Sequence, residues 1–175
     1  MKVCIAGLSQ SSRHLIPWNR EGWEIWGLAW DSQRYDLHRA FEIHDMPMIR
    51  TIWPSPDAYL DKISSCNRLY MADSYLPGSI KYPLDEVIAD VGDYFCSSIA
   101  YMLALAIHEK AEEILLCGVD MRADEEYGHQ RPNCEYLIGL ARGRGIKVTI
   151  PEQSPLCKYS NPALYEHDGR YGKSK

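Results

Sequence analysis

A glycine followed by small polar side chains comes directly after the first apolar segment of the chain. This loop, residues 7–12, includes Gly7, Ser9, Gln10 and Ser11. Free backbone amides and hydroxyls in front of a helix attract anions, so the loop is a candidate phosphate site, with Arg13 as a charged donor. A tight turn capped by serine explains the same residues, and that alternative stays open. The loop matches neither G-x-G-x-x-G nor a P-loop, which argues against a standard nicotinamide or Walker-type site.

Two later apolar segments are also followed by, or end in, residue types that take part in ligand binding and proton transfer. Asp31 follows residues 24–29, near the place where doubly wound nucleotide-binding proteins set a carboxylate against ribose hydroxyls. Its alternative role is to cap a short helix or turn over residues 32–40. His44 ends the segment 41–44 and is a candidate for contacting a base or transferring a proton, although a hydrogen-bonded structural role is equally compatible.

The densest polar cluster follows the apolar run 113–118. Asp120 lies two residues past that run, where a carboxylate can point into a crevice, and His129 is expected on a loop that leads to the next helix. Acid and base groups therefore have the chance to converge, and we take Asp120 and His129 as candidate catalytic residues. Gly118 and Ser97 complete the candidate nucleotide-binding set.

Metal ligands are not indicated by the spacing of the six cysteines, which includes no C-x-x-C pair and no adjacent C-x-x-H. We therefore assign no metal-binding residues. The sequence leaves open whether a divalent metal accompanies the nucleotide.

Apolar strand patterns alternate with helical patterns along the chain. The expected strands are residues 2–6, 24–29, 41–44, 68–71, 113–118 and 147–150, and the expected helices are residues 12–16, 55–63, 97–110 and 132–142. This alternation predicts an α/β fold with a doubly wound, mostly parallel Rossmann-like sheet of about six strands in the order 3-2-1-4-5-6 and helices on both faces. Residues 1–150 are expected to form one domain, and residues 151–175 a C-terminal extension that packs on it or is partly mobile.

Composition narrows the functional classes. The 175 residues are 46% hydrophobic and 25% charged, which is typical of a globular protein and excludes collagen-like and disordered classes. The formal charge of -5 argues against a broad nucleic-acid surface, and no stretch has the ~18 apolar residues that a membrane helix needs. We expect a cytoplasmic protein with a small-molecule nucleotide ligand. The 12 Tyr and 5 Trp suit a binding surface, and self-association to a homo-oligomer stays open.

Two segments resemble known families. Residues 98–107 and 111–121 are similar to a helix and strand shared by the archaeal 6-hydroxymethylpterin diphosphokinase (MptE-like) family and the bacterial CMP-sialic-acid-dependent sialyltransferases. Residues 127–151 look most like small Rossmann-like proteins of phages and prophages. The resemblance implies a nucleotide or nucleotide-sugar donor at Gly7, Ser9 and Asp120, and by analogy with the sialyltransferases it implies that His129 is the general base.

The chain also departs from these families. Their usual asparagine and proline in the first loop are replaced by Leu8 and Gln10, and Asp31 stands in place of an asparagine. Our first hypothesis is a transferase that uses a nucleotide-activated donor, for glycosyl or diphosphate transfer. The alternatives are a non-catalytic protein of phage or prophage origin that binds a nucleotide or nucleotide signal, and a structural or assembly protein.

Overall fold

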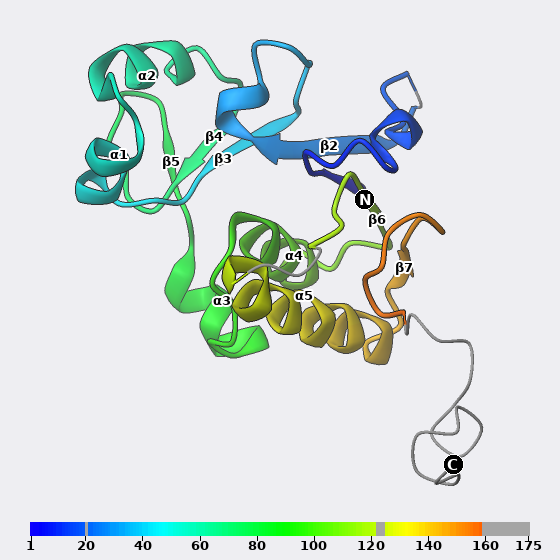
Figure 1. Ribbon diagram of the computed structural model, residues 1–175. Coiled ribbons are helices and arrows are strands. Elements are labelled where there is room, and N and C mark those ends of the chain that lie inside the picture. Colours follow the sequence, from blue (N-terminus) through cyan, green and yellow to red (C-terminus); the bar gives the residue numbers. More distant parts are fainter. Residues whose placement is uncertain (20, 122–124, 159–175) are drawn as a thin grey trace, which may run out of the picture.

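One parallel sheet organises the molecule (Figure 1). The computed structural model describes residues 1–19, 21–121 and 125–158, with side chains for all of these except 125–127. Within this part of the chain seven strands pair, all in parallel, in the order β5-β4-β3-β2-β1-β6-β7. The strands are β1 (Lys2–Ala6), β2 (Trp23–Leu28), β3 (Arg39–Glu42), β4 (Leu69–Met71), β5 (Ile80–Lys81), β6 (Glu113–Cys117) and β7 (Lys147–Thr149).

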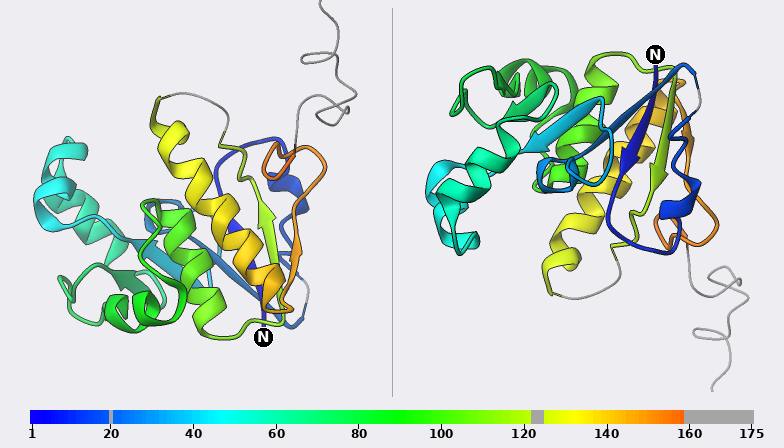
Figure 2. Two further views of the ribbon diagram at one scale, coloured as in Figure 1. Left: turned by 90° about the horizontal axis from the view of Figure 1, so that it is seen from below. Right: turned by 90° about the horizontal axis from the view of Figure 1, so that it is seen from above.

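Helices lie on both faces of the sheet, as predicted. They are η1 (Arg13–Leu15), η2 (Ala29–Asp31), α1 (Met46–Ile52), α2 (Pro56–Ile63), α3 (Leu84–Val91), α4 (Ser98–His108) and α5 (Glu125–Gly143). Successive residues of a strand point to opposite faces, so Val3 and Ile5 pack with α3, α4 and α5, while Cys4 and Ala6 pack with α1, α2 and the 3₁₀ turns. Figure 2 shows α4 and α5 side by side on one of these faces. No helix in the described ranges has both the length and the apolar character needed to cross a membrane.

The predicted order of the strands was wrong in one respect. We expected the fourth strand beside the first, but β4 pairs with β3 instead. After β3 the chain continues outward through α1 and α2, and only the apolar helix α4 carries it back over the central strands. Its return strand, β6, pairs with the free side of β1. The direction of winding therefore changes between β1 and β6, and the loops that follow these two strands become neighbours.

The helix predictions had mixed outcomes. Those for α2 and α4 were confirmed, and Ser97 caps α4 by accepting a hydrogen bond from the Ala100 backbone at 3.3 Å. The helix expected over 12–16 is only the three-residue turn η1, because Pro17 favours an extended conformation at the preceding residue, Ile16, which ends the turn. Helix α5 begins before Pro132, which lies inside it instead of opening it. The sequence analysis missed α1, α3 and the two-residue strand β5.

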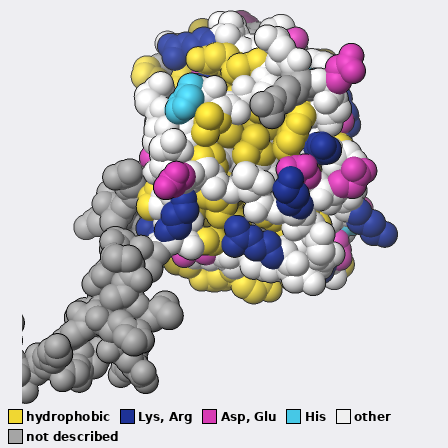
Figure 3. All heavy atoms as spheres, turned by 90° about the vertical axis from the view of Figure 1, so that its right-hand side faces the viewer, with side chains coloured by type: hydrophobic (Ala, Val, Ile, Leu, Met, Phe, Trp, Pro, Cys, Tyr) yellow, Lys and Arg dark blue, Asp and Glu magenta, His cyan; other side chains and the backbone are white. Residues whose placement is uncertain are grey.

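The short turn η1 leaves part of one face of the sheet thinly covered. Leu15 is 43% exposed, and Trp18, Trp23 and Leu115 are only partly buried. Figure 3 shows the side of the molecule that carries the loop after β1 and strands β6 and β7: hydrophobic side chains gather at its centre, with charged side chains of both signs around them. A full helix between β1 and β2 would cover this region in a standard doubly wound sheet.

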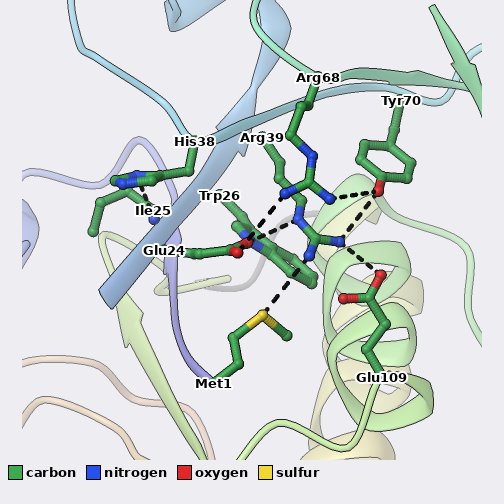
Figure 4. A network of polar contacts seen from close by, with 9 residues as sticks. All are labelled: Met1, Glu24, Ile25, Trp26, His38, Arg39, Arg68, Tyr70 and Glu109. Atoms are coloured by element: carbon green, nitrogen blue, oxygen red, sulfur yellow. Dashed lines mark hydrogen bonds and ion pairs between the residues drawn. The ribbon is translucent and has the colours of Figure 1, made fainter. Parts of the chain in front are cut away.

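An arginine network covers the edge of the sheet at which the strands begin, its amino-terminal edge (Figure 4). Arg39, only 4% exposed, donates to Glu24 at 2.8 Å and to Glu109 at 2.6 Å. Its guanidinium also lies 4.3 Å from the centre of the Trp26 ring and 3.2 Å from the Tyr70 hydroxyl. Three elements, β2, β3 and the end of α4, are therefore tied together through one side chain.

In this network, hydrogen bonds and contacts between opposite charges together affect the pKa values more than burial does. Burial acts to raise the pKa of Glu24, but hydrogen bonds from Trp26 and Arg39 and the charge of Arg39 outweigh it, so the pKa of that carboxyl is lowered. Burial likewise acts to lower the pKa of Arg39, and its contacts with Glu109 and Glu24 more than offset this and raise it. Both groups are thus held in their charged forms, and each depends on the other.

Removing the central cation should therefore destabilise the fold. We expect Arg39→Met to lower the free energy of unfolding by about 3 kcal/mol, because two partly buried carboxylates lose their cation. Arg50→Met is the matched control: Arg50 forms a surface pair with Asp57 at 3.9 Å and should change stability by about 0.5 kcal/mol or less. Urea unfolding of both variants measures the difference, and equal stabilities would contradict the role given to the network.

Candidate functional site

A cavity of about 810 Å³ opens at the carboxyl ends of β1, β2, β3 and β6, facing the amino-terminal end of α4. Ligand sites in parallel α/β sheets lie at this edge, next to the point where the winding reverses. Six of the residues singled out in the sequence line it: Gly7, Ser9, His44, Ser97, Gly118 and Asp120. The structure thus brings together residues that are up to 113 positions apart (120 - 7) in the sequence.

The floor of the cavity is a direct contact between two backbones. The Gly7 amide donates to the Cys117 carbonyl and the Ser9 amide to the Gly118 carbonyl, each at 2.8 Å. A Cβ on Gly7 would collide with the Gly118 carbonyl, and a Cβ on Gly118 would lie 2.6 Å from the Gly7 carbonyl. Gly118 also has a φ of 70°, in the left-handed region that favours glycine. The two glycines therefore let the loops after β1 and β6 meet.

Asp120 links these loops through its side chain. Its two carboxylate oxygens accept hydrogen bonds from Ser9 Oγ at 2.6 Å and Ser11 Oγ at 2.7 Å. Asp120 is 8% exposed and lines the cavity. Buried Ser12 adds a further link, since its Oγ accepts from the Gly118 amide at 2.9 Å. The serines expected to hold a phosphate thus donate, in this structure, to a carboxylate.

Two other predicted residues lie outside the cavity lining and support it. Arg13 and Asp31 form a buried ion pair, with the two residues 9% and 5% exposed. Arg13 also donates to the Gly7 carbonyl at 2.9 Å and lies 4.4 Å from the centre of the Tyr35 ring. Burial acts to lower the pKa of Arg13, but its bonds to Asp31 and Tyr35 outweigh this and raise it. The pair holds the first loop in place from outside the cavity.

The amino-terminal end of α4 forms another wall, with Cys96, Ser97 and Ser98. The first turn of a helix presents free backbone amides and a partial positive charge. Cys96 donates to the Asn133 side chain at 2.7 Å. Behind it, burial raises the pKa of Cys134 to about 12, so this thiol stays neutral and serves as packing. The α4 wall is thus electropositive through its backbone.

The third polar wall follows β3. His44 lines the cavity, and its Nδ1 lies 2.6 Å from the buried carboxylate of Glu42. The hydroxyl of Tyr59 donates to the other oxygen of that carboxylate. Apolar residues separate this wall from Asp120, among them Leu28, Ile43, Phe95, Tyr101 and Val119. The cavity therefore combines separate polar groups with an apolar lining, as small-molecule sites usually do.

The remaining predicted residues are less central. Gln10 is exposed and its side chain donates to the Leu8 carbonyl at 3.5 Å. His129 is exposed on α5 and does not line the cavity, whereas the next residue, Gln130, does. Among the described residues, no cluster of three or more His, Cys, Asp or Glu side chains is placed to hold a metal ion.

Sequence reasoning missed Glu42, which lies inside a segment with an ordinary strand pattern and whose partner, Tyr59, comes from a later helix. Ser12 belongs to the predicted loop 7–12, but its hydrogen bond with the distant Gly118 was not predicted. An acidic residue inside an otherwise apolar strand was the one available signal for Glu42, because such a residue is rarely buried without partners.

The first residues of the expected C-terminal extension also bear on the site. Ser154, 1% exposed, donates to the Val119 carbonyl at 2.6 Å, and Arg131 donates to the Pro155 carbonyl at 2.8 Å. Residues 151–158 thus hold the loop after β6 from behind. Residues 159–175 of that extension lie outside the described residues.

Comparison with known proteins bears on the fold. No protein-family model and no curated protein matches the sequence. Among solved structures, the chain is similar to the sialyltransferase CstII from Campylobacter jejuni in complex with cytidine-5'-monophosphate, with a TM-score of 0.57 and 16% identity over 88% of this chain and 80% of that one. A CstII complex with CMP-3FNeuAc has the same TM-score and identity, with coverages of 88% and 81%. One with a trisaccharide acceptor and CMP has a TM-score of 0.56, 14% identity and coverages of 89% and 82%.

These similarities establish a shared architecture, that of a distant sialyltransferase-like fold. The identities are too low to carry more than the fold. Membership of the MptE-like family and a phage origin, both expected from the resemblance, stay predictions.

The contact between the two glycine loops yields a paired prediction. Gly118→Ala should destabilise the protein by about 2 kcal/mol or more, because alanine is strained at this φ and its Cβ meets a backbone carbonyl. Gly139→Ala, at an open position within α5, should instead stabilise it by about 0.5–1 kcal/mol. Urea unfolding measures both changes, and a neutral Gly118→Ala would mean that the loops do not meet as described.

Proposed function

We propose that the cavity binds a nucleotide-activated donor and that the protein is a transferase, with glycosyl transfer as its reaction. The observation that carries this proposal is that one cavity is lined both by the buried carboxylate of Asp120 and by the amino-terminal end of α4. A nucleotide needs acceptors for its ribose hydroxyls and donors for its phosphate. The two walls supply one of each.

Asp120 is suited to the ribose. A carboxylate accepts hydrogen bonds from a diol, and its negative charge repels a phosphate. Ser9 and Ser11 already donate to it, so the ribose hydroxyls would join or replace hydroxyl donors of the same kind. Gly7 and Gly118 line the cavity beside Asp120, so their backbone would border the bound ribose.

The α4 wall is suited to binding the phosphate. Backbone amides at the start of this 11-residue helix and the hydroxyls of Ser97 and Ser98 are donors, and the helix dipole favours an anion there. We therefore propose the phosphate at α4 and the ribose at the glycine loops, and not the phosphate at the loop 7–12. The apolar lining between these walls would take the base or the transferred group.

The structural comparison supports this proposal. CstII, whose chain shares the fold, is described as a sialyltransferase in complex with CMP, with CMP-3FNeuAc and with a trisaccharide acceptor. By analogy, a nucleotide sugar is the donor class that we propose for this chain, and a sugar hydroxyl is the acceptor. His129, assigned as the base from the sequence resemblance, stays a candidate on the exposed side of α5.

The binding part of this proposal predicts a ligand-dependent gain in stability. CMP, UMP, AMP and GMP are tested singly by thermal unfolding of the full chain. A ligand at about 100 times its Kd adds about 2.7 kcal/mol, which for a chain of this size raises Tm by about 5–10 °C. Failure of all four nucleotides, and of their nucleotide sugars, to raise Tm would overturn the proposal.

Asp120 itself is tested by a double comparison. Asp120→Asn should weaken binding of the preferred nucleotide about tenfold or more, since a charged acceptor is replaced by a neutral one. The 2'-deoxy form of that nucleotide should bind wild type more weakly, and this penalty should shrink in Asp120→Asn, because both changes remove the same contact. Asp61→Asn, on the exposed face of α2, should leave affinity unchanged. A penalty that is equal in wild type and Asp120→Asn would remove Asp120 from the ribose site.

A further inference from the structure

A histidine in the cavity wall is backed by a buried carboxylate. Nδ1 of His44 lies 2.6 Å from Oε1 of Glu42, and the His44 backbone amide donates to the same oxygen at 3.2 Å. The His44 side chain is 45% exposed and lines the cavity, whereas that of Glu42 is 6% exposed. One edge of the imidazole is therefore held by the protein interior while the ring borders the cavity.

The carboxylate is fixed from its other side by Tyr59. This side chain comes from α2, is 6% exposed, and donates its hydroxyl to Oε2 of Glu42. Its ring is stacked on Trp53 with the ring centres 4.0 Å apart, so the hydroxyl has a defined position. Burial, together with the negative charge of Glu42, raises the pKa of Tyr59. The hydroxyl therefore remains a hydrogen-bond donor to Glu42.

This arrangement determines which nitrogen of His44 is basic. An ionised carboxylate only accepts hydrogen bonds, so Nδ1 must carry the hydrogen that lies between it and Glu42. A neutral imidazole with its hydrogen on Nδ1 has its lone pair on Nε2. Once Nε2 takes up a proton, the imidazolium is stabilised by the adjacent carboxylate, as in other histidine–carboxylate pairs.

We propose that His44 is the general base of the transfer reaction and that Glu42 and Tyr59 are its positioning residues. This inference rests on the proposed function. Nε2 of His44 takes the proton from the acceptor hydroxyl, and the acceptor oxygen forms a bond to the anomeric carbon of the donor sugar. The bond from that carbon to the phosphate oxygen breaks, and its electron pair leaves with the nucleotide, which is a nucleoside monophosphate from a CMP sugar and a nucleoside diphosphate from a UDP, GDP or ADP sugar. The proton on His44 then passes to water.

Placement favours His44 over His129 for this step. His44 borders the same cavity as Asp120 and the α4 wall, whereas His129 is exposed on α5 outside the cavity lining. The carboxylate behind His44 is also buried, so its hydrogen bond with His44 is stronger than one between two exposed groups.

The first test needs no substrate. Nitrogen-15 NMR of the histidine rings in the full chain should show neutral His44 as a single tautomer, with its hydrogen on Nδ1. In Glu42→Gln this preference should be lost, because the anionic acceptor is gone, and in Tyr59→Phe it should weaken. His108 is the internal reference, since its Nδ1 lies 3.2 Å from Asp90 at the other end of α4 and its signal should not change. A wild-type His44 with its hydrogen on Nε2 would overturn the proposal.

The second test separates binding from reaction. Wild type and His44→Gln are incubated with CMP-sialic acid and with UDP, GDP and ADP sugars, each in the presence of mono- and disaccharide acceptors, and release of the nucleotide is followed by chromatography. His44→Gln should bind the nucleoside monophosphate as wild type does but turn over about 10²- to 10⁴-fold more slowly. Glu42→Gln should lose about tenfold or more in kcat. His108→Gln, which removes a histidine–carboxylate pair remote from the cavity, should retain full rate.

The outcomes distinguish the two proposals. Suppose that wild type turns over the donor and that His44→Gln, shown by urea unfolding to be folded, does so at the same rate. This result would overturn the role of His44 and leave the transferase function standing. Nucleotide binding without turnover by wild type would overturn the transferase function, and with it the base. Loss of turnover together with loss of nucleotide binding in His44→Gln would make His44 a binding residue and overturn its assignment as base.

Discussion

The contact between the Gly7 and Gly118 backbones is the constraint on which the site depends. Because β1 and β6 pair side by side, the loops after these strands begin next to each other, and their backbones meet at Gly7 and Gly118. Any side chain at either position would push them apart. With the loops in contact, Asp120 comes within reach of Ser9 and Ser11, and the carboxyl edge of the sheet acquires a closed floor. Arg13 and Asp31 then hold the first loop from outside the cavity.

The two ends of the sheet have separate roles. At the amino-terminal edge, Arg39 of β3 pairs with Glu24 of β2 and with Glu109 at the end of α4. These charged groups are thus paired with one another within the protein. At the carboxyl edge, polar groups line a cavity instead. Helix α4 connects both ends: its last turn is held by Arg39 through Glu109, and its first turn forms a cavity wall. The arginine network therefore fixes the orientation of the helix whose amino terminus we propose as the phosphate site.

The sequence predicted most of the elements and the edge of the sheet at which the site lies. Strands such as β6 are continuous apolar runs, and α4 has both a serine cap and a buried face, so their patterns are unambiguous. The strand order was not predictable in the same way, because nothing in residues 68–71 records which neighbour they pair with. The helix after Gly7 was overestimated, since the cap pattern was read without enough weight on Pro17. Contacts such as Glu42 with Tyr59 depend on tertiary packing and leave almost no local signal.

The spacing of the polar walls bears on the size of the ligand. His44 follows β3 and Asp120 follows β6, and in the order β3-β2-β1-β6 three interstrand gaps separate these strands. At about 4.8 Å for each gap, the two strands lie roughly 14 Å apart. A ligand that reaches both walls is therefore longer than one sugar ring or one phosphate. A nucleoside bound at Asp120 with its phosphate at α4 would direct the transferred sugar toward His44, so the geometry fits a nucleotide joined to a sugar better than a free nucleotide.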